Sequence, residues 1–308
     1  SVVFGGFSPE SLKDRILDSD CQTVITADEG VRGAKKIPLK ENVDIALLDC
    51  PRVHTVLIVK RTGAEINLVN ERDVFYDEII STVSAECPPE IMNAEDPLFI
   101  LYTSGSTGRP KGVLLPHHNV LRLFLATDDQ YKFSNKDVWT LFHSYAFDFS
   151  VWEIWGPLLH GGKLVVVPHM VTRDPELFYD LVCEQKVTVL NQTPGAFQQF
   201  IGVDDQRSKK IDSLRYVIFG GDALNIEILR PWWKNHADNN PLLVNMYGIT
   251  ETANWVGGAS AVDYDPMDGL VGQIWAGNVA VRQESGEVRD TGVGDILVQT
   301  PTIMKGYL

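Results

Sequence analysis

Apolar and polar positions alternate along the chain in two patterns, short β-branched runs and longer amphipathic stretches. The runs predict strands at residues 22–26, 54–59, 98–101, 163–167, 187–190, 216–219, 242–246 and 295–298. Helical patterns begin near Ser8, Leu121, Asp174, Pro194 and Ile226. Strands separated by helices of this length are typical of parallel βαβ units. The chain is therefore expected to be an α/β protein with layered, parallel-rich sheets flanked by helices and a β-rich C-terminal end.

Two helix starts carry specific signals. Ser8 and Asp174 each stand directly before a proline, which is the arrangement of a capping residue followed by proline in the first turn. Leu12, Ile16 and Leu17 are expected to fall on one face of the first helix, its apolar face. The run at 163–167, which Pro168 follows, is expected to be a buried strand.

Composition narrows the class of protein. The 308 residues carry a net charge of −14, which argues against nucleic acid or an anionic membrane as the main partner. The four cysteines do not have the spacing of a metal knuckle or a Cys-x-x-Cys motif, so free thiols and a cytoplasmic location are expected. No run approaches a membrane span, and no signal-peptide pattern is visible. Because the chain begins at Ser1 without methionine, it is expected to be an excerpt.

The segment 101–113 carries the strongest chemical signal, reading Leu-Tyr-Thr-Ser-Gly-Ser-Thr-Gly-Arg-Pro-Lys-Gly-Val after an apolar run. Its glycines allow close backbone approach, and its hydroxyls and Lys111 are groups that a polyphosphate needs. It does not follow the usual P-loop spacing, since Gly108 precedes Arg109 and Lys111 precedes Gly112. The alternative is an ordinary solvated turn. Its position after a strand favours a phosphate loop of another type.

Three further segments carry candidate chemistry. Asp148 lies among aromatic residues, where a carboxylate is costly without a partner, although it could simply cap the following helix. Residues 245–251 follow a strand, and open α/β sheets place ligands at the carboxyl ends of strands. A surface turn at Gly248 with a solvated glutamate is the alternative there. Gly220 and Gly221 form a tight turn after the strand at 216–219, a weaker signal because double glycines mark many turns.

Taken together, these strings resemble the adenylate-forming (AMP-binding) enzyme superfamily. The loop at 101–113, the Phe-Asp-x-Ser motif at 147–150 and the Asn-x-Tyr-Gly-x-Thr-Glu motif at 245–251 carry the resemblance. Residues 1 to about 104 resemble acetyl-CoA synthetase, and residues from about 112 to 308 resemble an amino-acid adenylation domain of a nonribosomal peptide synthetase. The resemblance implies that 1–308 is an incomplete adenylation core, part of the large N-terminal domain of that fold. The change of relative near the loop suggests a recombinant or ancestral-style chain.

The resemblance also implies a reaction and its residues. ATP and a carboxylate would give an acyl-adenylate and pyrophosphate, with Lys111, Thr250 and Glu251 as catalytic residues and Glu251 facing Mg²⁺. Tyr247 would pack on adenine, Asn245 would reach its edge, and Thr250 would bond the α-phosphate. The full ATP or AMP set comprises Thr103, Ser104, Gly105, Ser106, Thr107, Gly108, Lys111, Gly220, Gly221, Asn245, Tyr247, Gly248 and Thr250.

Within the same resemblance, the amino-acid pocket would have Asp148 as the acceptor for the substrate ammonium. Its lining would be Asp148, Phe149, Trp152, Asn191, Ile218, Gly220, Met246, Asn254 and Trp255. The first seven resemble the lining of threonine-activating domains. These seven positions predict a small polar, threonine-like amino acid as the substrate. Asn254 and Trp255 depart from the expected valine and histidine, and Trp255 is far larger than the histidine that would meet the threonine hydroxyl.

The implied cofactors are ATP and Mg²⁺, with CoA or the phosphopantetheine arm of a carrier protein as acyl acceptor and Arg32 as a candidate CoA contact. The family's next motif, Tyr-Arg-Thr-Gly-Asp, and its small C-terminal lid domain are expected beyond Leu308. Without them, weak nucleotide binding and slow turnover are expected. Alternative functions are a non-catalytic nucleotide-binding or structural remnant, an acetate or short-acyl CoA ligase, and a simple phosphotransferase.

Overall fold

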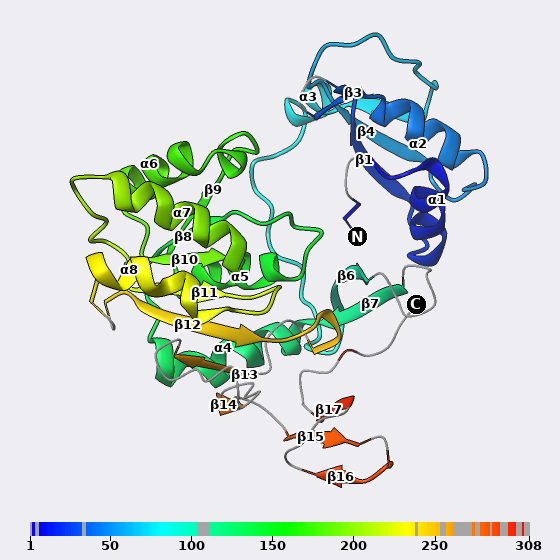
Figure 1. Cartoon of the computed structure of the whole chain (residues 1–308). Coiled ribbons are helices and arrows are strands. Elements are labelled where there is room, and N and C mark those ends of the chain that lie inside the picture. The colour runs from blue at the N-terminus through cyan, green and yellow to red at the C-terminus, as the bar shows by residue number, and fades with distance from the viewer. Residues whose placement is uncertain are drawn as a thin grey trace. The chain divides into compact units, whose positions relative to one another are not determined.

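The computed structural model describes residues 2–3, 6–32, 35–103, 111–237, 240–252, 257–260, 273–274, 278–283, 285–289, 295–299 and 304. The chain divides into two compact units (Figure 1). The first comprises Ser1–Leu114 with Gly306–Leu308, and the second comprises Leu115–Lys305. Each unit is described by itself.

The first unit contains a small parallel sheet covered by helices. Its elements are α1 (Pro9–Asp18), β1 (Thr23–Ala27), β2 (Gly30–Arg32), β3 (Lys35–Ile37), α2 (Leu39–Leu47), β4 (Thr55–Val59), β5 (Asp73–Phe75), α3 (Tyr76–Ile80), β6 (Pro97–Thr103) and β7 (Lys111–Pro116), the last of which runs into the second unit. Strands β1, β4 and β5 pair in parallel in that order, and β6 pairs with β7. Alternate residues Val24, Val56 and Ile58 point into the core.

The predicted cap of the first helix is confirmed, because the Ser8 side chain accepts a hydrogen bond from the backbone N–H of Ser11. The predicted apolar face is buried only in part, since the Leu17 side chain is 51% exposed. The buried positions beside it are Ile16 and Arg15. The Arg15 guanidinium donates to the Ser11 carbonyl at 2.7 Å and lies over the Tyr102 ring, so a long cationic side chain is buried on this helix together with Ile16.

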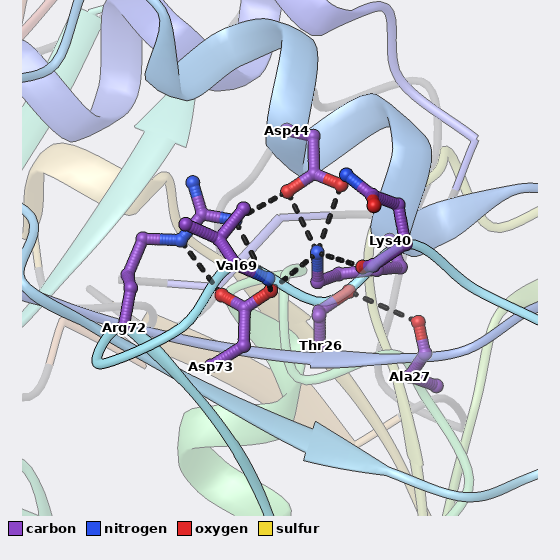
Figure 2. A network of polar contacts seen from close by, with 8 residues as sticks. Thr26, Ala27, Lys40, Asp44, Val69, Arg72 and Asp73 are labelled. Atoms are coloured by element: carbon purple, nitrogen blue, oxygen red, sulfur yellow. Dashed lines mark hydrogen bonds and ion pairs between the residues drawn. The ribbon is translucent and has the colours of Figure 1, made fainter.

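A buried network of ion pairs joins α2 to β5 in the first unit (Figure 2). The Lys40 side chain is 1% exposed, and its Nζ lies 2.7 Å from Asp44 Oδ1 and 2.8 Å from Asp73 Oδ2. Arg72 bonds the same two carboxylates from the other side. Burial raises the pKa of Asp73, but hydrogen bonds from Arg72 and Lys40 outweigh it and hold that pKa below its usual value. The network was not anticipated from the sequence.

The second unit is built on a larger sheet. Its elements are α4 (His117–Tyr131), β8 (Val138–Leu141), α5 (Phe149–His160), β9 (Lys163–Val166), η1 (Val171–Arg173), α6 (Pro175–Gln185), β10 (Val189–Gln192), α7 (Pro194–Gln206), β11 (Tyr216–Phe219), η2 (Ile226–Leu229), α8 (Arg230–Asn235), β12 (Leu242–Tyr247), η3 (Thr250–Thr252), β13 (Gly257–Ser260), β14 (Gln273–Ile274), β15 (Asn278–Arg282), β16 (Val288–Arg289) and β17 (Asp295–Gln299).

Among the described strands, seven form one sheet in the order β14-β13-β12-β11-β10-β8-β9. The neighbours from β12 to β9 run parallel, which confirms the predicted βαβ units, and β13 and β14 are antiparallel. The register sets Asn191 beside Ile218 and Ile218 beside Val244. The carboxyl ends of the parallel strands therefore meet at one edge.

Apolar layers cover both faces of this sheet. On one face, residues of β10, β11 and β12 pack with α6, α7 and α8, centred on Phe197, Phe200 and Trp232 (Figure 1). On the other, Trp139 packs against Phe133 and against Trp152 of α5. The predicted burial of the strand at 163–167 is wrong in part: Val166 is 67% exposed because β9 is the edge strand. None of the helices in the described part of the chain is both long and apolar enough to cross a membrane.

Gly156→Ala is expected to destabilise the protein by about 1–3 kcal/mol, because overpacking a filled core forces neighbours to shift. A Cβ at this position of α5 would lie 2.5 Å from Cη2 of the Trp139 ring. Gly202→Ala is the matched control, since Gly202 also lies in a helix and its Cβ would meet nothing within 4 Å. Urea unfolding measures both. Equal stabilities for the two variants would contradict the packing argument.

Candidate active site

Three of the predicted motifs meet at the carboxyl edge of the large sheet. The Thr250 hydroxyl donates to Asp148 Oδ2 at 2.7 Å, which links residues 102 positions apart. Gly221 has a φ of +79°, and a Cβ there would lie 3.1 Å from the ring of Phe147. The segment before α5, the turn after β11 and the segment after β12 are thus in contact within the second unit.

Asp148 is a half-buried carboxylate whose pKa is raised above its usual value. It stands at the N-cap position of α5, but its side chain makes no capping hydrogen bond, in contrast to the capping alternative. Burial raises the pKa of Asp148, and the negative charge of Glu251 raises it further, while the hydrogen bond from the Thr250 hydroxyl opposes these effects. No lysine or arginine of the described residues forms an ion pair with it. A ligand cation would supply the missing compensation.

The predicted pocket residues of the sheet and α5 share one side of the sheet. Trp139 is paired with Val189, and Asn191 lies two residues further, so alternation puts all three on the same face. Ile218 pairs with Asn191 and is fully buried, as are Phe149 and Trp152; Met246 is 3% exposed. The predicted residues Asn254 and Trp255 lie outside the described residues.

Asn191 has an unusual environment for an amide. It is fully buried, and neither its Oδ1 nor its Nδ2 has a hydrogen-bond partner among the described residues. The indole N–H of Trp152 is also buried and has no hydrogen-bond partner among the described residues. Buried polar groups are nearly always paired, so an amide with neither its oxygen nor its nitrogen paired points to a polar ligand.

The nucleotide-binding candidates are divided between the units. Thr103 ends β6 and Lys111 begins β7, both half-buried in the first unit. The loop between them, with Ser104, Gly105, Ser106, Thr107 and Gly108, lies outside the described residues, as does the side chain of Arg32. Asn245, Tyr247, Gly248 and Glu251 belong to the second unit, at and after the end of β12, and all four are half-buried. They are thus less exposed than a fully solvated turn would be.

Glu251 is the candidate for Mg²⁺. It lies in the short η3 turn, and its carbonyl accepts a hydrogen bond from the Met304 N–H at 2.7 Å. The described residues contain no cluster of three or more histidines, cysteines or carboxylates that could enclose a metal. Magnesium commonly binds through one or two carboxylates together with substrate phosphates. The donor set therefore fits a metal that arrives with ATP.

Sequence reasoning missed one pair next to Asp148. Glu153 of α5 is fully buried and accepts hydrogen bonds from the backbone N–H groups of Phe142 and His143. The Nδ1 of His143 lies 3.0 Å from the same carboxylate. The sequence held one signal of this pair: Glu153 lies between Trp152 and Ile154 in a strongly apolar helix. A charged side chain in such surroundings is rarely buried without a specific partner.

A parallel sheet with polar loops and an acceptor carboxylate at its carboxyl edge defines a ligand-binding α/β protein. The chain belongs to the AMP-binding enzyme family of adenylate-forming ligases, whose model matches residues 1–308. It is 60% identical to a dimodular nonribosomal peptide synthase of Bacillus subtilis over 223 residues, which is 72% of this chain and 9% of the synthase. It is 40% identical to an acetyl-coenzyme A synthetase of Gamma-proteobacterium EBAC31A08 over 279 residues, covering 82% of this chain and 42% of that protein. Malpinin synthetase of Mortierella alpina is 56% identical over 154 residues, half of this chain and 2% of its own length.

These relatives confirm the predicted superfamily and fold class. The chain spans less than half the length of each of them. The 223 residues shared with the peptide synthase are more than the segment from 112 to 308 contains, so that similarity also extends into the preceding part. The two similarities therefore overlap, and the recombinant hypothesis stays a prediction.

Proposed function

We propose that the protein activates a small polar, threonine-like amino acid with ATP, giving an aminoacyl-adenylate and pyrophosphate. The observation that carries the proposal is the contact between Asp148 and Thr250, which joins the amino-acid motif to the nucleotide motif. The buried amide of Asn191 on the same side of the sheet supports a polar side chain in the substrate. The relatives named as peptide synthases support an amino acid over acetate.

In the proposed reaction, Asp148 holds the substrate ammonium so that the carboxylate reaches the α-phosphorus. A bond forms between the carboxylate oxygen and phosphorus as the bond to pyrophosphate breaks. Lys111 and the loop hydroxyls hold the β- and γ-phosphates, and Tyr247 and Asn245 hold adenine. When bound, Mg²⁺ at Glu251 would neutralise phosphate charge. The protein acts mainly through positioning and electrostatic stabilisation.

Thr250 has one hydroxyl proton for two acceptors. It bonds Asp148 in the structure, whereas the proposed reaction has it bonding the α-phosphate. An ammonium bound at Asp148 would replace this bond, since it supplies its own donors and charge. Binding of the amino acid would thus release the hydroxyl for the nucleotide.

The acceptor of the acyl group would be a thiol, on CoA or on a carrier-protein arm. A short-acyl CoA ligase is the second candidate function, because the acetyl-coenzyme A synthetase similarity covers 82% of the chain. We place the reaction in the cytoplasm, since all four cysteines are free thiols.

Lys111→Ala is expected to lower amino-acid-dependent ATP–pyrophosphate exchange by about 10²–10³-fold, because it removes a donor from the transferring phosphates. Panels of amino acids and short carboxylates identify the substrate class in the same assay. Lys35→Ala is the control, an exposed lysine of the same unit. Exchange with acetate alone would favour the CoA ligase. A thermal shift with Mg·ATP but no exchange would favour a binding module, and release of phosphate in place of pyrophosphate would favour a phosphotransferase.

A further inference from the structure

The buried carboxylate of Glu153 determines which ring nitrogen of His143 donates a hydrogen bond. The Glu153 carboxylate is fully buried and already accepts two backbone N–H groups, at 3.3 Å from Phe142 and 3.0 Å from His143. An ionised carboxylate only accepts hydrogen bonds, so the ring nitrogen that faces it, Nδ1, must carry a hydrogen. In the neutral ring the other nitrogen, Nε2, is then an acceptor.

Nε2 of His143, the acceptor of the neutral ring, has no partner among the described residues. The side chain is 8% exposed, and the structure gives this buried atom no hydrogen-bond partner among the described residues. A buried polar atom left unpaired costs about 1–3 kcal/mol. Since Nδ1 faces Glu153, Nε2 faces away from it, and a donor from a ligand would satisfy it.

The ring lies against the walls of the candidate site. It stacks on Phe149, with centroids 4.4 Å apart and planes 16° apart, and lies 5.8 Å from the ring of Phe147. Asp148 stands between these two phenylalanines in the chain, so the ring that contacts both of them lies beside the segment that carries the carboxylate. A carboxylate and an imidazole nitrogen are therefore both offered at the segment from Phe147 to Phe149.

We propose that His143 is a second contact for the substrate ammonium: Asp148 binds it as a counter-ion, and Nε2 accepts one of its hydrogens. The proposal rests on the proposed function, in which the substrate is an amino acid. A group with three N–H donors and a positive charge matches two neighbouring acceptors, whereas acetate or another simple carboxylate has nothing to donate. Glu153 serves as a positioning residue that holds the ring and its tautomer, in the manner of orienting carboxylates elsewhere.

The test is ATP–pyrophosphate exchange by His143→Asn with two substrates, L-threonine and its deamino analogue 3-hydroxybutanoate. Asparagine keeps an N–H donor for Glu153 and lacks Nε2. The KM for threonine is expected to rise about 10-fold, the value for one hydrogen bond to a charged group, with kcat nearly unchanged. The KM for 3-hydroxybutanoate is expected to stay as in the wild type. His160→Asn, the same change at a histidine whose Nδ1 bonds the Gly156 carbonyl, is the control.

An unchanged KM for threonine in folded His143→Asn, or equal rises for both substrates, would overturn the contact and leave the proposed function intact. No exchange by the wild type with any amino acid would overturn the proposed function, and this inference with it. Nitrogen-15 spectra of histidine-labelled wild type keep the test independent of the variant's folding. One of the seven histidines should show a shifted acceptor nitrogen with threonine and not with 3-hydroxybutanoate. If threonine shifts no histidine nitrogen, the contact does not exist.

Discussion

Asp148→Asn is expected to lower kcat/KM for amino-acid-dependent exchange by about 10²-fold or more. Removing one partner of a desolvated, hydrogen-bonded charge pair costs on the order of 2–5 kcal/mol, and each 1.4 kcal/mol is a factor of about ten. The loss should appear mainly as a higher KM for the amino acid, because the ammonium is held in the ground state as well as in the transition state. Exchange kinetics at saturating Mg·ATP measure it.

Asparagine makes this test selective, because it is as good an N-cap residue as aspartate. If Asp148 only capped α5, Asp148→Asn would keep both stability and exchange. Asp222→Asn provides the control, since Asp222 is an exposed residue that follows the Gly220–Gly221 turn. Kinetic constants of Asp148→Asn equal to those of the control would exclude Asp148 as the ammonium site.

Lys40→Met is expected to destabilise the first unit by about 3–5 kcal/mol. The change removes the buried cation that lies between Asp44 and Asp73 and leaves Arg72 as the one cation described beside these two carboxylates, so one buried negative charge loses its counter-charge. Urea unfolding followed by circular dichroism measures the loss. All seven tryptophans lie between residues 139 and 275, within the second unit, so their fluorescence follows that unit separately. In Lys40→Met, the dichroism transition should therefore occur at a lower urea concentration than the fluorescence transition.

The matched control is Lys36→Met, which breaks an ion pair with Glu29 on a lysine that is 67% exposed. Such surface pairs contribute about 0–1 kcal/mol. The difference in free energy of unfolding between wild type and Lys40→Met should shrink in acid. The pKa of Asp73 is lowered in the folded protein, so the ionised Asp73 stabilises the fold at neutral pH. This contribution is lost as the pH falls through the pKa of Asp73 in the folded protein. Similar losses for Lys36→Met and Lys40→Met would refute the role of the network.

Most elements of the second unit could be predicted because their signals are local. The capping side chain of Asp174 accepts from the N–H groups of Glu176 and Leu177, as its place before a proline predicts. The strand expected at 216–219 forms at those residues. Exposure was predicted less well: Leu17 and Val166 are both more than half exposed, because burial depends on which element packs over each face.

The sequence by itself determined the α/β class, the alternation of strands and helices from β9 to β12, and the motifs that place the chain in its family, since each depends on residues close together along the chain. Tertiary structure decided which of these residues meet. The hydrogen bond from Thr250 to Asp148 spans 102 positions and depends on the parallel pairing of β10, β11 and β12. The burial of Lys40 between two carboxylates and the pairing of Glu153 with His143 are likewise set by packing. A single sequence records such contacts only as isolated polar residues in apolar surroundings, because the energy that makes them specific arises when folding removes water from around them.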